Sequence, residues 1–145
     1  MQALQLEIVT IHNFYRSGVT GANITGLTYS LAVEAGSQIY ANYLAANLLF
    51  QHSTTPFGEN LWMGPVGMSP TNMISAFGNE KQYFKYGIFP DVSTTGDWRD
   101  VGHYTQIIWR DTREVGCAGA LGSDGRYRYV CRYNPPGNYY GRLVY

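Results

Sequence analysis

The chain has 145 residues, the usual size of one domain, with ten basic and ten acidic residues. Only 14% of its residues are charged, and this balanced, low charge argues against nucleic acid or an anionic membrane as a partner. No segment approaches the ~20 apolar residues of a membrane span. We therefore expect a single domain over residues 1–145 with no transmembrane segment.

Two long helices are expected first. Residues 2–16 carry apolar side chains at close to helical spacing. A second helix is predicted over residues 31–50, with Ser30 as its N-cap. The apolar stripe of this alanine-rich helix is interpreted as its packed face: Leu31, Ala35, Ile39 and Tyr43.

A third helix is predicted from Ser69 to about Tyr86, and a short one around 103–109. The apolar residues of the third helix are expected in the core: Met73, Ile74, Phe77 and Phe84. Helices thus dominate the first two thirds of the chain, and strands are expected in the last third. This order predicts an α+β fold with helices packed on a small sheet.

The predicted strands form a hairpin around the turn at Ser123-Asp124-Gly125. A turn centred on Asp124 places Cys117 opposite Cys131. The same register gives one largely apolar face: Val115, Leu121, Tyr127, Tyr129 and Tyr133. The hairpin arginines fall on the other face: Arg126, Arg128 and Arg132.

Opposed cysteines can form a disulfide, which implies an oxidising compartment; two buried thiols in a cytosolic protein are the alternative. The pair lacks the spacing of a zinc knuckle or a redox dithiol. The N-terminal residues also lack the basic and apolar regions of a signal peptide. Secretion would therefore require that a signal has been removed from this sequence.

Four stretches, in chain order, resemble the signatures of one family. They are HNFYR at 12–16, HSTTPFGENLW at 52–62, GHYTQIIW at 102–109 and RYNPPGNYYG at 132–141. Together they are similar to the CAP superfamily of cysteine-rich secretory, antigen 5 and pathogenesis-related 1 proteins, also called the SCP domain. The resemblance implies a three-layer α-β-α sandwich with a small antiparallel sheet, in a secreted, extracellular protein. The cysteine pair matches one family bridge, although eukaryotic members usually hold more.

The resemblance also implies a central cleft lined by two histidines and two glutamates: His52, Glu59, Glu80 and His103. Imidazoles are good zinc ligands, so His52 and His103 are the predicted ligands of an exchangeable divalent metal. The carboxylates would be further ligands, partners that orient the rings, or a general base. Without metal, the four residues would form a hydrogen-bonded cluster that ties helices to the sheet.

Three functions stay open. The resemblance favours a non-catalytic binding module for sterols, fatty acids or other small hydrophobic ligands, with a role in defence or host interaction. A zinc-dependent, peptidase-like hydrolase with Glu59 or Glu80 as base is the second hypothesis, and an adhesion or signalling surface the third. A serine protease is disfavoured because Ser53 lies in no nucleophile elbow. The oligomeric state is left open between a monomer and a weak dimer.

Two residues of the first stretch are interpreted as structural. His12 is expected to have a structural role, and Arg16 is expected to fix its helix to a carbonyl or a carboxylate.

Overall fold

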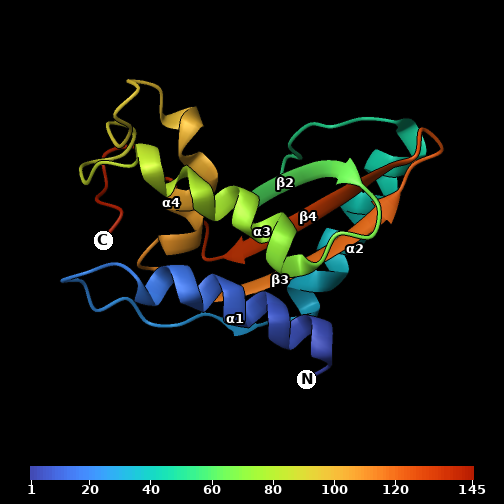
Figure 1. Ribbon diagram of the computed structural model, residues 1–145, viewed down its shortest axis with the longest axis horizontal. Coiled ribbons are helices and arrows are strands. Elements are labelled where there is room, and N and C mark those ends of the chain that lie inside the picture. The colour runs from blue at the N-terminus through green and yellow to red at the C-terminus, as the bar shows by residue number, and fades with distance from the viewer.

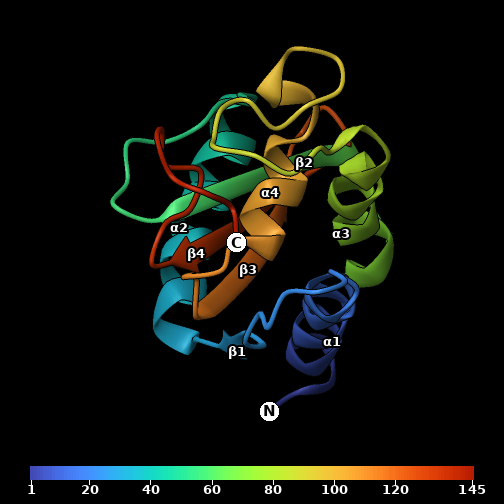
Figure 2. The same ribbon diagram turned by 90° about the vertical axis from the view of Figure 1, so that its left-hand side faces the viewer.

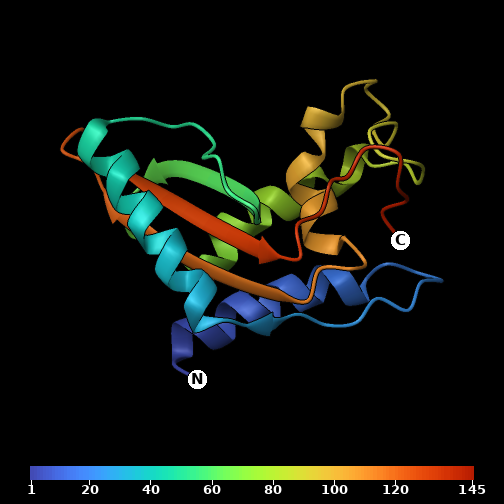
Figure 3. The ribbon, with the colours of Figure 1, turned by 180° about the vertical axis from the view of Figure 1, so that it is seen from behind.

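A four-stranded sheet lies between two layers of helices in the computed structural model, which describes residues 1–145 (Figures 1 and 2). Helices α1 (Ala3–Ser17), α3 (Pro70–Gly78) and α4 (Gly102–Ile108) cover one face. Helix α2 (Leu31–Asn47) crosses the opposite face (Figure 3). The predicted three-layer α-β-α sandwich is confirmed. None of the helices combines the length and the apolar character needed to span a bilayer.

The sheet has the strand order β1-β3-β4-β2. Its strands are β1 (Thr28–Tyr29), β2 (Gly58–Pro65), β3 (Glu114–Leu121) and β4 (Arg126–Asn134). Strands β2, β3 and β4 pair antiparallel, as expected, whereas the short β1 pairs parallel with β3. The parallel pair places the start of α2 against the edge of the sheet.

The β3–β4 hairpin has the predicted register. Cys117 pairs with Cys131, and the two cysteines form a disulfide across the strands. Gly125 has a φ of 78°, the left-handed conformation that glycine adopts without strain in such a turn. Turn chemistry and alternation were therefore sufficient to predict this element.

The arginine face of the hairpin is not a free basic surface. Arg128 is buried beneath α2, where its Nη1 donates to Asp124 at 2.7 Å and its Nε donates to the Leu49 carbonyl at 3.0 Å. Arg132 is paired with Glu59 at 3.1 Å on the same face. Only Arg126 is exposed. Asp124 lies only four residues from Arg128, whereas Glu59 and the Leu49 carbonyl come from distant segments that local sequence cannot reveal.

The predicted core face of α2 is wrong. Leu31, Ile39 and Tyr43 are 64%, 72% and 49% exposed, and Ala35 is exposed as well. The residues that pack on the sheet are instead mostly small: Val33, Ser37, Ala41, Leu44 and Ala45.

Close backbone approach explains this choice of face. A Cβ added to Gly116 of β3 would lie only 2.3 Å from the backbone nitrogen of Glu34. The Ser37 hydroxyl also donates to the Gly116 carbonyl at 2.8 Å. Large side chains would hold α2 away from the sheet, so the side of the helix with small residues faces inward.

Two helices end earlier than predicted. Helix α2 stops at Asn47 because Leu48 adopts a left-handed conformation with a φ of 53°. Helix α3 ends at Gly78, and a 3₁₀ turn over Asn79–Tyr83 takes its place. The predicted N-cap Ser30 is confirmed, since it accepts from the backbone at 3.1 Å, and Ser69, predicted to open the third helix, caps α3 in the same way at 3.1 Å.

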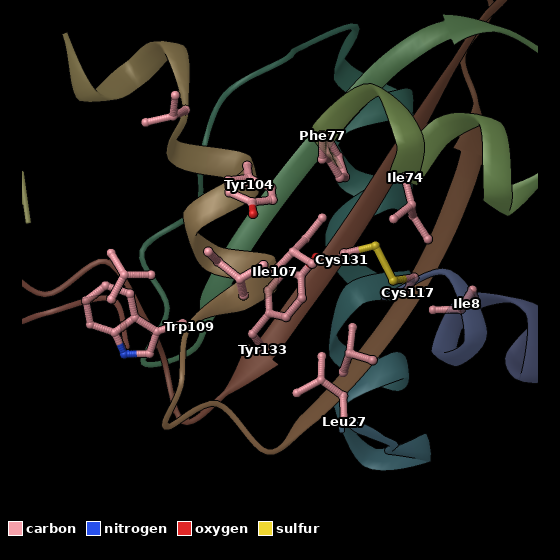
Figure 4. Packing of buried hydrophobic residues seen from close by; sticks show 14 of the residues in the cluster. Ile8, Leu27, Ile74, Phe77, Tyr104, Ile107, Trp109, Cys117, Cys131 and Tyr133 are labelled. Atoms are coloured by element: carbon pink, nitrogen blue, oxygen red, sulfur yellow. A yellow bond between two sulfur atoms is a disulfide. The ribbon is translucent and has the colours of Figure 1, made fainter. Parts of the chain in front are cut away.

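The main core fills the space between the sheet and the layer of α1, α3 and α4 (Figure 4). Side chains from all four elements meet there, including Ile8, Ile74, Phe77, Ile107 and Tyr133. Met73 belongs to this core as predicted, whereas Phe84 is only partly buried at its edge.

Candidate functional site: a polar cleft with two histidine–glutamate pairs

A cleft of about 430 Å³ opens at the end of the sheet beside α4. His52, Glu59 and His103 line it, together with backbone and side chains of the loop that follows β4. Only two of its 14 lining residues are hydrophobic, Phe57 and Trp98. Glu80 is not on the cleft wall but contacts the ring of His103. The cleft is therefore suited to polar or charged ligands.

The first pair joins the loop before β2 to the start of that strand. His52 Nδ1 lies 2.9 Å from Glu59 Oε1, and the imidazole is largely exposed while the carboxylate is buried. Glu59 also accepts from Ser53 N–H at 2.9 Å, from Ser53 Oγ at 2.5 Å and from Arg132 Nε at 3.1 Å. Both of its carboxylate oxygens therefore have donors.

Burial acts to raise the pKa of Glu59, but the hydrogen bonds outweigh it. Donors on His52, Ser53 and Arg132 hold the pKa of this carboxyl below its ordinary value. A carboxylate stabilised in this way has little tendency to take a proton from water. The structure thus gives no support to Glu59 as a general base.

The second pair connects the 3₁₀ turn after α3 with α4. Glu80 Oε2 accepts from His103 Nδ1 at 2.8 Å, and Oε1 accepts from the backbone N–H groups of His103 and Tyr104 at 3.0 and 3.1 Å. Glu80 therefore caps α4, because Val101 at the N-cap position has no side-chain acceptor. The His103 ring also stacks on Phe77 with 4.7 Å between centroids.

Both imidazoles contact their glutamate through the same nitrogen, Nδ1. A carboxylate can only accept a hydrogen bond, so Nδ1 of His52 and of His103 carries a proton. In the neutral ring, Nε2 then holds the lone pair that can bind a metal or accept from a ligand. The glutamates thus orient the rings.

Each of the two histidines can offer one ring nitrogen to an ion. No group of three or more histidine, cysteine, aspartate or glutamate side chains is close enough to hold a metal. Zinc sites with fewer than three protein ligands need water in the remaining positions and bind weakly. The residues therefore fit only an exchangeable ion.

Ser53 has no arrangement for nucleophilic catalysis. Its Oγ contacts Glu59 Oε2 at 2.5 Å and accepts from Arg132 Nη2 at 2.9 Å. An activated serine requires a neighbouring base that takes its proton, usually an imidazole, and Ser53 makes no hydrogen bond to His52. The hydroxyl instead helps to hold the Glu59 carboxylate.

Sequence reasoning missed the residues that support the cleft from beneath. Asn60 is 2% exposed and donates from Nδ2 to the His103 carbonyl and to Tyr133 Oη, both at 3.1 Å. Tyr133 Oη lies 2.9 Å from His12 Nε2, and His12 Nδ1 lies 2.7 Å from the Ile8 carbonyl. One chain of hydrogen bonds therefore joins α1 to the cleft.

Arg16 fixes the other end of α4. It is buried, as is His12, and both act as structural residues, in line with the sequence analysis. The guanidinium donates to backbone carbonyls at and beyond the end of α4 and before β1: Thr25, Ile107, Trp109, Arg110 and Thr112. The helix that carries His103 is thus held in place by a single buried cation.

An α-β-α sandwich with a polar cleft between two histidine–glutamate pairs defines a recognisable class of domain. The sequence matches the model of the "Cysteine-rich secretory protein family", CAP, over residues 9–133. The chain belongs to this family. The resemblance found in its motifs is thereby confirmed.

Plant proteins are among its curated relatives. Pathogenesis-related protein PR-1 of Medicago truncatula is 40% identical over 111 residues, which cover 75% of this chain and 62% of that protein. Pathogenesis-related protein 1A of Nicotiana tabacum is 36% identical over 145 residues, 99% of this chain and 82% of the relative.

Solved structures share the fold. NaASP2, crystallised with Zn²⁺, superimposes with a TM-score of 0.82 at 24% identity, covering 100% of this chain and 86% of that one. BmVAL-1 gives a TM-score of 0.78 at 24% identity and covers 100% of this chain and 83% of its own.

Proposed function

We propose that the protein is a secreted, non-catalytic binding module that holds a small hydrophobic ligand, such as a sterol or an acyl chain, in a groove beside α1. The groove has a volume of about 340 Å³ and lies between α1, the start of α3 and the sheet. Eight of its 14 lining residues are hydrophobic, among them Leu4, Ile8, Met68 and Met73. This apolar lining is the observation that carries the proposal.

The polar cleft is less suited than the groove to a hydrophobic ligand. It offers only two hydrophobic side chains, so burial of an acyl chain there would gain little. The two hollows therefore serve different ligands.

The relatives support the proposed biological role and the proposed location outside the cell. The two plant relatives described above are named pathogenesis-related proteins, which favours a role in defence or host interaction. The disulfide favours an oxidising compartment, and the family's name points to secretion. We place the protein outside the cell on these grounds.

A matched pair of variants tests the groove. Leu4 and Leu6 are both exposed leucines of α1, but only Leu4 lines the groove. Leu4→Asp introduces a charge beside the ligand, and we expect it to weaken binding of 1-dodecanol about tenfold, measured by isothermal titration calorimetry. Leu6→Asp is the control and should bind like the parent protein. Equal affinity in all three proteins would refute the groove as the binding site.

A divalent metal in the cleft is a second proposed ligand, favoured by the two Nε2 atoms that the glutamates orient. NaASP2, which shares the fold, was solved with Zn²⁺. We expect weak Zn²⁺ binding that is lost when His52→Ala and His103→Ala are combined. Glu59→Gln should weaken it by 10-fold or more, because ring-orienting partners matter by about that much.

The control for the metal experiment is 1-dodecanol binding, which the double variant should retain. Undiminished Zn²⁺ uptake by that variant would show that the metal binds elsewhere. If neither 1-dodecanol nor Zn²⁺ binds, an adhesion or signalling surface becomes the favoured function.

A further inference from the structure

One tyrosine that lines the groove has a buried hydroxyl group without a hydrogen-bond partner. Tyr129 of β4 lines the groove and is only 4% exposed. Its Oη is the one buried side-chain polar atom of the protein that makes no hydrogen bond. Buried polar groups are nearly always paired, so an unpaired one calls for an explanation, and a ligand oxygen is one candidate partner.

Neighbouring tyrosines do not share this feature. Tyr133, on the same face of β4, has its hydroxyl bonded to His12 and Asn60. Tyr127 lines the groove beside Tyr129, with 6.3 Å between ring centroids, but it is only half-buried. The unmet hydrogen-bonding capacity is therefore specific to Tyr129.

The Tyr129 hydroxyl is a donor under ordinary conditions. Burial raises the pKa of Tyr129 far above its usual value, and the nearby tyrosines and Glu7 act in the same direction. The group therefore keeps its proton and can donate to an acceptor oxygen of a ligand.

The polar residues of the groove carry no positive charge. They are Gln2, Gln5, Glu34 and Gln38, and no lysine, arginine or histidine lines the groove. Glu34 Oε1 accepts from Tyr29 Oη at 2.5 Å and from Gln5 Nε2 at 3.4 Å, so its carboxylate is fixed near this end. An anionic headgroup would meet a like charge there and no cation.

We propose, on the basis of the groove function above, that the groove selects uncharged amphiphiles over free fatty acids, and that the ligand's oxygen accepts a hydrogen bond from Tyr129. The ligand class is a fatty alcohol, a sterol or an acyl ester. The ligand gains apolar burial along Ile8 and Met73 and satisfies the buried hydroxyl. Leu4 and Met68 border the groove and are 63% and 40% exposed, so neither side chain is locked in the core.

Two ligands with the same chain and different headgroups test this selectivity. Calorimetry at neutral pH would compare 1-dodecanol with dodecanoate, which share the apolar part and differ in charge. We expect the alcohol to bind at least about tenfold more tightly, because the carboxylate loses its hydration without gaining a cation. Glu34→Gln should narrow this ratio by strengthening dodecanoate binding.

Tyr129→Phe tests the hydrogen bond, with Tyr127→Phe as the matched control. We expect the first variant to lose about fivefold in affinity for 1-dodecanol and to leave dodecanoate unchanged. The second should leave both ligands unaffected. Thermal melts of both variants check that each is folded.

The outcomes separate the two proposals. Dodecanoate that binds as well as the alcohol, or a Tyr129→Phe variant that behaves like Tyr127→Phe, overturns the selectivity but leaves the groove function intact. Binding of neither ligand overturns both.

Discussion

Two tyrosines of β4 show how the environment of a single hydroxyl decides its contribution to the stability of the fold. Tyr129 and Tyr133 point to the same face of the sheet and are both buried. The hydroxyl of Tyr133 has two partners, whereas that of Tyr129 has none. Removing a hydrogen-bonded hydroxyl leaves its partners without a hydrogen bond. Removing a hydroxyl that has no partner relieves the cost of its desolvation.

This contrast leads to a prediction for the free energy of unfolding. Tyr133→Phe should lower it by about 1–2 kcal/mol, because His12 and Asn60 lose a partner. Tyr129→Phe should leave it unchanged or raise it by up to about 1 kcal/mol. Urea denaturation of the ligand-free variants measures both. Equal losses would mean that the Tyr129 hydroxyl has a partner in solution.

The cleft shows which functional residues local sequence can identify. His52, Glu59, Glu80 and His103 were assigned by family motifs, and the structure forms two pairs from them. The partner roles of Asn60 and Arg132 were missed because their contacts join residues 73 positions apart. Alternation along β2 gave no signal, because helices cover both faces of the sheet and Asn60 and its neighbour Leu61 are both buried.

At the scale of elements, the hairpin and α2 differ in how strongly their sequences specify a face. The hairpin has strict alternation and a defined turn, so its register could be predicted. Helix α2 is rich in alanine and carries apolar residues on several sides, so periodicity alone cannot select the packed face. Close approach to Gly116 decides it, and that requirement comes from the sheet.

Substitutions on the two sides of α2 test this assignment. Ile39→Ser lies on the exposed face and should change the free energy of unfolding by no more than about 0.5 kcal/mol. Leu44→Ala lies on the packed face and should cost about 2–5 kcal/mol, because it leaves a cavity against Leu61 and Val130. Chemical denaturation of both variants provides the measurement. A large loss in Ile39→Ser would indicate that a partner covers the exposed face.

Across the whole molecule, one buried chain of hydrogen bonds couples stability to pH. It runs from the Ile8 carbonyl through His12, Tyr133 and Asn60 to the carbonyl of His103. His12 Nδ1 donates to the Ile8 carbonyl, so Nε2 must be unprotonated to accept from Tyr133. Protonation of His12 would turn Nε2 into a donor, so the Tyr133 hydroxyl would lose its acceptor and the link between α1 and the sheet would weaken.

The pKa of His12 gives the pH range of this effect. Burial lowers the pKa from 6.5 to about 4; the bond to the Ile8 carbonyl acts in the opposite direction, and the charge of Arg16 reinforces the lowering. Between these two values the unfolded chain binds a proton that the folded protein does not bind. The contribution of neutral His12 to the free energy of unfolding is therefore fully retained above pH 6.5. It is lost as the pH falls toward 4, and the total loss is about 3 kcal/mol.

Comparison with His12→Gln isolates this contribution. The variant should be less stable at neutral pH, and its free energy of unfolding should fall less steeply between pH 6.5 and 4 than that of the parent. Glu59 does not produce the same pH dependence. Its lowered pKa stabilises the fold at pH values above 4.5, the ordinary pKa of the group, and this stabilisation is lost only as the pH falls below 4.5. Urea denaturation at intervals of pH measures both curves. Parallel curves would show that His12 is not the group that resists protonation, and that the link between α1 and the cleft does not depend on its neutral form.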